Sequence, residues 1–308
     1  MNKNKNGIAV SSLYTAATWA WGAIPCAHFV TPKEALPIFK FVNFYMALYR
    51  KLNPAKFSLK HQLLHRHAAI DKLLHDNQCK RIVEIACGFS PRGSQLSARA
   101  DIDYTEMDLP EVTQAKRVQL AQSAEGRAVL ARANFHLKVG DIARINFVAA
   151  FASGKSKPTE KIAIVTEGLM MYFTREQQMP IWKNIAALLK QTGGIYLFDY
   201  IPLCDEPPRS RLGDFLHRLR TRVFKMKPGF AYDNRSRNDI ADDLKAAGFP
   251  CVEAIDTGRI SQAWQFPQAE EPTRTIIYCC RADLPAAPSV TQQDAEITFL
   301  NTAKGVHV

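Results

Sequence analysis

Apolar and polar residues alternate along the chain in two different periods. Between residues 34 and 76 the apolar positions recur every three or four residues, which predicts two helices separated at Pro54. From residue 82 onward, short apolar runs alternate with amphipathic stretches, and the borders between them carry glycine or proline. Strands that alternate with helices predict an α/β fold with a mostly parallel sheet and helices on both of its faces.

Seven of the apolar runs have the length of β-strands. We expect strands at residues 82–86, 104–107, 135–139, 162–166, 195–200, 251–256 and 275–280. We expect helices between them at residues 93–100, 111–123, 174–190 and 238–247. The third of these helices opens with the capping box Thr174-Arg-Glu-Gln177.

Composition divides the chain into three parts. Residues 1–78 are predicted to form a helical arm and cap, and because polar residues and Pro25 interrupt the apolar stretch of the arm, we expect neither an export signal nor a membrane span. Residues 79–284 hold the alternating strands and helices, and residues 285–308 form a polar tail. Residues 202–235 interrupt the alternation with a proline-rich, basic segment, which we interpret as an inserted lid or, alternatively, as a solvated basic face.

Composition also narrows the class of protein. The 308 residues are 47% hydrophobic, which is enough for one large α/β domain or for such a domain with a cap. The net charge of +11 allows an anionic partner, but many basic enzymes bind no polyanion, so charge alone does not predict nucleic acid. The seven cysteines are odd in number and include no C-x-x-C pair, which argues against a disulfide framework and favours a reducing, cytoplasmic location.

Acidic residues stand near the ends of the predicted strands. Glu84 lies within the first strand, Asp108 follows the second, Asp141 follows the third and Glu167 follows the fourth. The carboxyl ends of parallel strands meet at one edge of a sheet, so we expect these side chains to line one ligand site. An acid after the second strand of such a fold binds ribose hydroxyl groups, which predicts an adenosine-containing cofactor at Asp108. The alternative is that each carboxylate is simply exposed at a strand end.

The loop after the first strand distinguishes between two such cofactors. A dinucleotide needs a G-x-G-x-x-G loop whose backbone amides reach the pyrophosphate, but here Ala86 and Gly88 are followed by the bulky Phe89 and Pro91. S-adenosylmethionine carries no phosphate, and its cationic sulfonium and ammonium groups attract carboxylates. We therefore predict S-adenosylmethionine as the cofactor.

A metal site is not expected. His61, His65 and His67 stand close together in the sequence, and the first two could share one face of a helix. No acidic partner suited to a metal accompanies them, so we expect these histidines at the protein surface.

Several short segments of the chain resemble the leucine carboxyl methyltransferase superfamily, a group of S-adenosylmethionine-dependent O-methyltransferases. These segments are Ser11–Ala16, His65–Asp71, Glu84–Arg92, Tyr104–Arg117, Gly140–Ile142 and Thr166–Tyr172. Ala86 and Ser90 depart from the family pattern, which has glycine and aspartate at these positions. The resemblance implies the class I methyltransferase fold, a Rossmann-like, mostly parallel sheet of seven strands.

The resemblance also implies residues of the cofactor site. Arg66 would pair with the methionyl carboxylate, Asp108 would bind the ribose, and Asp141 with Ile142 would lie at the adenine. The complete set of predicted cofactor-binding residues is Arg66, Glu84, Ala86, Gly88, Asp108, Leu109, Asp141, Ile142, Glu167 and Gly168.

The residues predicted to meet the methyl acceptor are fewer. Tyr172 is the catalytic candidate and would line the acceptor pocket; the alternative is an aromatic residue of the core. Arg92 could hold an anionic acceptor or form an ion pair with Glu84 or Glu106. Asp199 and Tyr200 would close the fifth strand at the pocket edge or, alternatively, form a plain helix-loop cap.

The predicted reaction is transfer of a methyl group to a carboxylate or hydroxyl of a small-molecule acceptor. The displacement is in-line, so the enzyme mainly has to align the reacting atoms. A carboxylate is already ionised and needs no base, and we find no His/Asp pair suited to that role, so we favour a carboxylate. Two alternatives stay open: methylation of a macromolecule, either a protein carboxyl terminus or a modified tRNA nucleoside, and a protein that binds the cofactor without catalysis.

Overall fold

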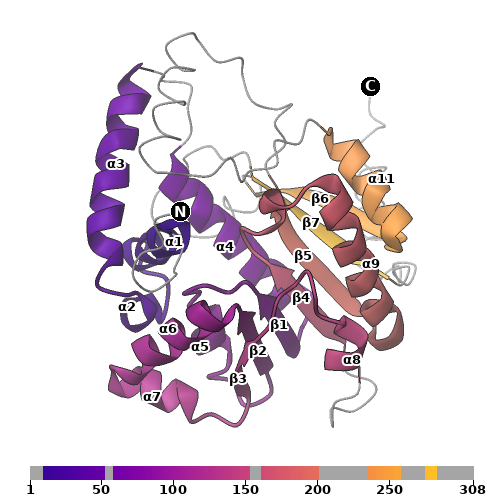
Figure 1. Ribbon diagram of the computed structural model, residues 1–308, viewed down its shortest axis with the longest axis horizontal. Helices are drawn as coiled ribbons and strands as arrows, with labels where there is room; N and C mark the ends of the chain where they lie inside the picture. Colours follow the sequence, from indigo (N-terminus) through magenta and orange to yellow (C-terminus); the bar gives the residue numbers. More distant parts are fainter. Residues whose placement is uncertain (1–9, 53–57, 153–160, 201–234, 258–274, 283–308) are drawn as a thin grey trace, which may run out of the picture.

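A central sheet flanked by helices organises the computed structural model, which describes residues 10–52, 58–152, 161–200, 235–257 and 275–282 (Figure 1). The strands are β1 Arg81–Ile85, β2 Asp103–Asp108, β3 Phe135–Val139, β4 Ile162–Thr166, β5 Gly194–Tyr200, β6 Cys251–Asp256 and β7 Ile276–Arg281. The longer helices are α1 Val10–Trp21, α3 Ala35–Leu52, α4 Leu59–Asp76, α6 Pro110–Ala121, α9 Arg175–Thr192 and α11 Arg237–Ala247. The shorter ones are α2 Ala27–Val30, α5 Arg92–Leu96, α7 Ala124–Leu130, α8 Phe147–Phe151 and the 3-10 helix η1 Met170–Tyr172.

The seven described strands form one sheet in the order β3-β2-β1-β4-β5-β7-β6. Pairs from β3 to β5 are parallel, and β7 runs antiparallel to both β5 and β6. The order turns back between β1 and β4, and in open α/β sheets ligands bind beyond the carboxyl ends of the strands at that point. All seven predicted strands are confirmed, each to within one residue at its ends.

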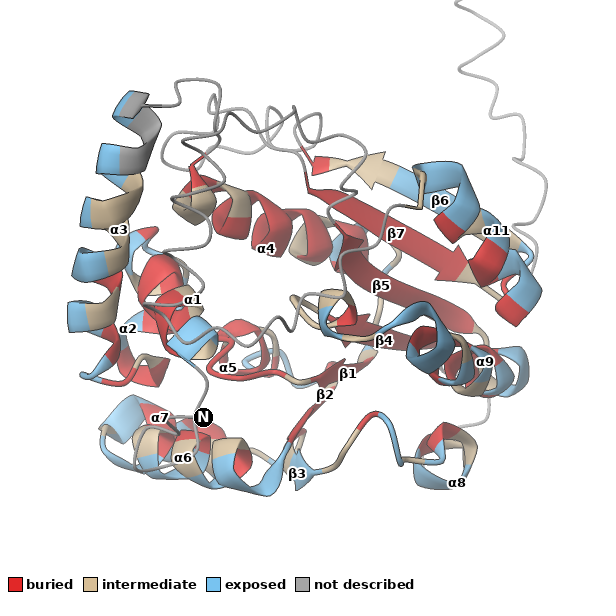
Figure 2. Ribbon diagram, turned by 45° about the horizontal axis from the view of Figure 1, so that its top comes forward, coloured by how far each residue is buried: buried red, intermediate tan, exposed pale blue. Residues whose placement is uncertain are grey.

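Alternating residues of the central strands pack against helices on opposite faces of the sheet. On one face Val83 and Ile164 join Trp182 and Ile185 of α9 in a cluster that also includes α8 and α11. On the other face, Ile82, Ala163 and Val165 pack against Ile70, Leu73 and Leu74 of α4. Figure 2 shows α4, β5 and β7 buried along most of their lengths. Strands covered on both faces are apolar throughout, which is why the runs were recognisable in the sequence.

The described residues between 10 and 76 form four helices, α1 to α4. Leu13 of α1 and Leu64 of α4 meet Phe89 from the loop after β1 and Leu120 of α6 in one apolar cluster. This N-terminal layer therefore packs directly on the segment that connects β1 to α5. No described helix combines the length and the apolar content needed to cross a membrane.

Some expectations differ from the structure or lie beyond it. The helix predicted at residues 93–100 ends at Leu96, because Ala98 and Arg99 bond carbonyls three residues back in tight turns. The short helices α7 and α8 were not predicted. The insertion predicted at residues 202–235 lies outside the described residues apart from Arg235, and the predicted tail 285–308 lies wholly outside them.

Two neighbouring glycines at the start of β5 provide a test of the packing between β5 and β4. Gly193 and Gly194 both have positive φ values, of 67° and 116°. A Cβ atom on Gly194 would overlap the carbonyl oxygen of Ile162, whereas one on Gly193 would come no closer than 3.7 Å to the side chain of Lys161. We expect Gly194→Ala to lower the free energy of unfolding by about 3 kcal/mol and Gly193→Ala by about 1 kcal/mol. Urea titrations of both variants measure this difference, and equal losses would contradict it.

Candidate cofactor site

The loop after β1 and the end of β2 form one side of the candidate site. Ala86 and Gly88 in this loop have φ values of 55° and 52°, a region that only glycine adopts freely. The Asp108 carboxylate at the end of β2 accepts hydrogen bonds from the backbone N–H of Gly88 (2.7 Å) and of Leu109 (2.8 Å). Burial raises the pKa of Asp108, and these two hydrogen bonds oppose that shift. Asp108 therefore joins the two segments that the sequence predicted to share a cofactor.

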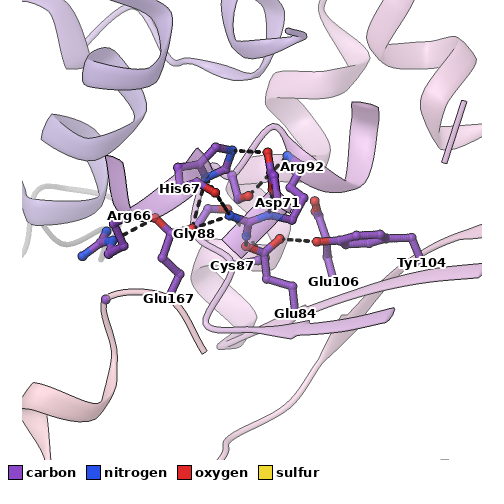
Figure 3. A network of polar contacts seen from close by, with 12 residues as sticks. Arg66, His67, Asp71, Glu84, Cys87, Gly88, Arg92, Tyr104, Glu106 and Glu167 are labelled. Atoms are coloured by element: carbon purple, nitrogen blue, oxygen red, sulfur yellow. Dashed lines mark hydrogen bonds and ion pairs between the residues drawn. The ribbon is translucent and has the colours of Figure 1, made fainter. Parts of the chain in front are cut away.

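A buried group of charged side chains forms the other side of the site, and Figure 3 shows most of its members. We call this group the arginine–carboxylate cluster. It consists of Arg66, His67 and Asp71 of α4, Glu84 of β1, Arg92 of α5, Glu167 after β4 and Asp199 of β5. Helix α4 and four separate segments of the domain thus meet beside the carboxyl ends of β1, β4 and β5.

Arg66 lies between two carboxylates. Its Nε donates to Glu167 Oε1 at 2.9 Å, and its Nη1 donates to Asp199 Oδ2 at 3.0 Å. The backbone N–H of Gly168 donates to the other oxygen of Asp199. Gly168 has a φ of 69°, and a Cβ atom there would approach the Arg66 guanidinium to 3.1 Å, so a glycine suits this position.

Arg92 is fully buried and makes contacts on all sides. Its guanidinium forms ion pairs with Asp71, Glu84 and Glu167, the last at 2.7 Å, and lies 2.8 Å from His67 Nδ1. Of the alternatives stated for Arg92, the structure contains the ion pair with Glu84. The second oxygen of Glu84 accepts a hydrogen bond from the Tyr104 hydroxyl at 2.8 Å.

Burial and neighbouring charges move the pKa values of the cluster in opposite directions. Burial alone would raise the pKa of Glu167, but His67, Arg66 and Arg92 hold it well below its usual value. Burial raises the pKa of Asp199 despite the opposing charge of Arg66. Of Glu167 and Asp199, Glu167 is therefore the one whose negative charge is more firmly held.

The cluster carries more negative than positive charge. Its two arginines face the carboxylates of Asp71, Glu84, Glu167 and Asp199, which leaves formal negative charge in excess: two charges with neutral His67, and one with protonated His67. Excess charge of one sign away from water is costly unless a group of the opposite sign accompanies it. The cluster is therefore suited to a ligand that carries cationic groups.

The expectation that the three histidines lie at the surface is wrong. His61, His65 and His67 are all buried. Trp21 packs against the ring of His61 and Trp19 against that of His67, at centroid distances of 5.6 and 4.9 Å. Two residues of α1 thus cover His61 and His67, which the sequence of α4 alone does not reveal. The part of the chain that the structure describes contains no group of His, Cys, Asp or Glu arranged to hold a metal ion.

The remaining predicted residues occupy different environments. Asp141 is only half-buried and accepts a hydrogen bond from the N–H of Ala143 at 3.0 Å, whereas Ile142 is buried. Tyr172 is 41% exposed, so the alternative that places it in the core is wrong. Tyr200 is buried at the end of β5, and the Asp199 side chain belongs to the cluster rather than to a cap.

A second buried ion pair lies beside the loop after β1. Glu106 of β2 and Lys116 of α6 are both fully buried, with Nζ 2.5 Å from Oε2. The Lys116 ammonium also donates to the backbone carbonyl of Ser90 at 2.7 Å. A Cβ atom on Gly93 would overlap the Glu106 carboxylate, so a glycine leaves room for this pair. The sequence suggested Arg92 as a partner of Glu106, whereas the structure pairs Glu106 with Lys116. Sequence reasoning gave no site role to Lys116 or His67, since each acquires its partners only in the folded chain.

The fold agrees with the comparisons made with known proteins. Five parallel strands in the order β3-β2-β1-β4-β5 are followed by the antiparallel β7 and then by β6. This arrangement is the class I methyltransferase fold. The sequence profile of the leucine carboxyl methyltransferase family matches residues 27–186, just over half of the chain. The chain belongs to this family, and S-adenosylmethionine is the family's cofactor. No curated protein matches the chain.

Solved structures of methyltransferases resemble the chain at low sequence identity. The S-adenosylmethionine-dependent methyltransferase SibL, in its apo form, has 14% identity and a TM-score of 0.46, over 88% of this chain and 70% of that one. An O-methyltransferase from Nostoc punctiforme, described as putative, has 10% identity and a TM-score of 0.47, over 90% and 77%. PigF bound to S-adenosylhomocysteine has 14% identity and a TM-score of 0.40, over 72% of this chain, which spans 58% of PigF. At these identities the similarity concerns the fold alone.

The buried Glu106 predicts a specific pH dependence of stability. Burial raises its pKa from 4.5 to about 7, although Lys116 opposes the shift. The folded state then binds more protons than the unfolded state between these values, so this carboxyl group stabilises the fold less as the pH rises through that window. Glu106→Gln removes the titration. We expect its free energy of unfolding to increase relative to the wild type from pH 5 to pH 8.

Urea titrations at both pH values measure this difference. Glu125→Gln, on the exposed surface of α7, is the matched control. A Glu106→Gln difference that stays constant with pH would contradict the prediction.

Proposed function

We propose that the protein is an S-adenosylmethionine-dependent O-methyltransferase that methylates a carboxylate of a small-molecule acceptor. The observation that carries this proposal is the arginine–carboxylate cluster, with its excess of negative charge beside the carboxyl ends of β1, β4 and β5. The membership of the chain in the leucine carboxyl methyltransferase family supports it.

The residues present suit the cofactor. S-adenosylmethionine supplies a methyl group on a cationic sulfonium, together with an ammonium group and a carboxylate. Arg66 would pair with that carboxylate, leaving Glu167 and Asp199 beside the cationic groups. Each Asp108 oxygen already accepts one backbone N–H and has a further lone pair for a ribose hydroxyl. Asp141 and Ile142, after β3, would lie at the adenine, and Leu109 would contact the same nucleoside.

Arg92 contributes in a different way from the acceptor contact predicted from the sequence. Its guanidinium is fully enclosed by Asp71, Glu84 and Glu167. A direct contact with an acceptor would break one of these buried ion pairs. Arg92 instead fixes the positions of Glu84 and Glu167, and so orients these two carboxylates of the site.

Acceptor chemistry follows from what methyl transfer needs. The acceptor oxygen must lie about 3 Å behind the methyl carbon, in line with the bond that breaks. An ionised carboxylate attacks without losing a proton, so no general base has to stand next to it. Tyr172, partly exposed in η1 after Glu167, would line the acceptor side of the pocket, and Tyr200 would close it at the end of β5.

The proposal is tested first by calorimetric titration of the protein with S-adenosylhomocysteine, with NAD as the control. Binding of the first in the micromolar range and none of the second is the expected result. Methyl transfer from S-adenosylmethionine is then measured with matched aromatic acceptors that carry either a carboxylate or a phenol. Transfer to the phenol alone would contradict a carboxylate acceptor, and no binding of S-adenosylhomocysteine would contradict the whole proposal.

Asp108→Ala should weaken binding of S-adenosylhomocysteine by about 1–3 kcal/mol, since the ribose hydroxyls lose their acceptor. Asp108 also holds two backbone N–H groups, so Asp108→Asn, which keeps one acceptor oxygen, should lose less. Calorimetric titration of the three proteins gives the affinities, and thermal unfolding reports the fold. Asp101→Ala on the exposed surface is the control. An Asp108→Ala affinity equal to that of the wild type would place the ribose elsewhere.

Glu167→Gln should discriminate between the two forms of the cofactor. The substitution removes one negative charge, so it should weaken S-adenosylmethionine, which bears a sulfonium, about 3- to 10-fold more than S-adenosylhomocysteine, which does not. The fold should survive, because Arg66 keeps Asp199 and Arg92 keeps Asp71 and Glu84. Parallel titrations with both ligands measure the ratio. An unchanged ratio would contradict the electrostatic role, and a collapsed melting temperature would assign Glu167 to stability.

A further inference from the structure

Lys116 is an unusual residue for its position. Its side chain is fully buried on α6, although lysine is almost never completely enclosed in a protein unless it is paired. The ammonium group has two described contacts, the Glu106 carboxylate on β2 and the backbone carbonyl of Ser90 in the loop after β1. The buried ion pair is thus connected directly to the loop that borders the candidate cofactor site.

Two of the contacts that hold the loop to its surroundings involve charged side chains. The backbone N–H of Gly88 donates to Asp108 at 2.7 Å, and the carbonyl of Ser90, two residues on, accepts from Lys116 at 2.7 Å. Between β1 and Gly88 the chain passes through Ala86, whose left-handed backbone (φ 55°) is unfavourable for a residue with a Cβ atom. Such a conformation persists only where the surrounding structure fixes it. Lys116 and Asp108 supply two of the contacts that do so.

The ion pair with Glu106 explains why Lys116 can be buried. It does not explain why the ammonium group also points toward the carbonyl of Ser90. A buried ion pair is frequently no more stabilising than two apolar side chains of similar volume, so stability alone does not require a lysine here. The hydrogen bond to Ser90 has a specific consequence, because it orients a backbone that also presents the Gly88 N–H to Asp108. Gly93, next to Arg92 in α5, leaves the space that the Glu106 carboxylate needs to accompany this lysine.

We infer that Lys116 is a positioning residue for the cofactor. By fixing the Ser90 carbonyl, its ammonium group holds the loop of residues 86–90 so that Gly88 stays bonded to Asp108, and Asp108 keeps its free lone pairs directed at the ribose. Lys116 does not touch the ligand. This inference rests on the proposed function of Asp108.

The test compares two variants that differ in the hydrogen bond to Ser90: one keeps the Lys116 ammonium without its carboxylate partner, and the other carries neither charge. Glu106→Gln keeps Lys116 and its hydrogen bond to Ser90, whereas Glu106→Gln combined with Lys116→Met removes the bond and both charges. We expect the first variant to bind S-adenosylhomocysteine within about threefold of the wild type. We expect the dissociation constant of the double variant to be at least tenfold higher than that of the first.

A stability-matched control separates positioning from loss of fold. Gly193→Ala lies before β5, far along the chain from the loop, and is expected to destabilise the protein without changing the dissociation constant. All titrations are carried out well below the melting temperature of each variant. Should the double variant not fold, Lys116→Gln in the Glu106→Gln background takes its place, since glutamine is one atom shorter than lysine, and the same loss of affinity is expected.

The outcomes separate this inference from the function on which it rests. A wild-type protein that binds S-adenosylhomocysteine together with a folded double variant of equal affinity would overturn the positioning role alone. A wild-type protein that does not bind would overturn the proposed function and this inference with it. A tenfold loss in the double variant that Gly193→Ala does not reproduce supports the role of Lys116.

Discussion

The rest of the site depends on the burial of four carboxylates around two arginines. Such an arrangement is stable only where each charge has a partner, and the fold supplies the partners from elements far apart in the sequence. Helix α4 brings Arg66 to Glu167 and Asp199, and α5 brings Arg92 to Asp71 and Glu84. The N-terminal helices cover this group, so their packing on the domain also sets the electrostatic environment of the candidate site.

The way in which the loop after β1 is fixed distinguishes this site from a dinucleotide site. A pyrophosphate needs several free backbone N–H groups, which glycines make accessible. Here the N–H of Gly88 is already bonded to Asp108, and the carbonyl of Ser90 is bonded to Lys116. The loop therefore forms a fixed side of the site rather than an anion-binding loop. This suits a nucleoside without phosphate, and it permits Ala86 where a more open approach would need glycine.

The strands could be predicted from the sequence because residues such as Ile162–Thr166 are apolar on both faces of a parallel sheet. The positions of Glu84, Asp108 and Glu167 near strand ends were equally visible. The ion-pair partners of the buried carboxylates could not be predicted, since Arg92 and Lys116 are separated in sequence from the carboxylates they contact. The histidines of α4 were misplaced because the sequence marks them as polar, whereas Trp19 and Trp21 cover two of them. Helices α7 and α8, of seven and five residues, are too short to show a helical period.

The charge of the cluster also constrains the order of events in the proposed reaction. An anionic acceptor approaching a site with an excess of negative charge meets repulsion that a low-dielectric environment strengthens. A bound cofactor with a net positive charge reduces this repulsion and places its sulfonium where the acceptor carboxylate is attracted to it. A carboxylate acceptor is therefore compatible with this site only when the cofactor binds first. A neutral phenol meets no such barrier, so a binding order in which cofactor and acceptor enter independently would favour a hydroxyl acceptor instead.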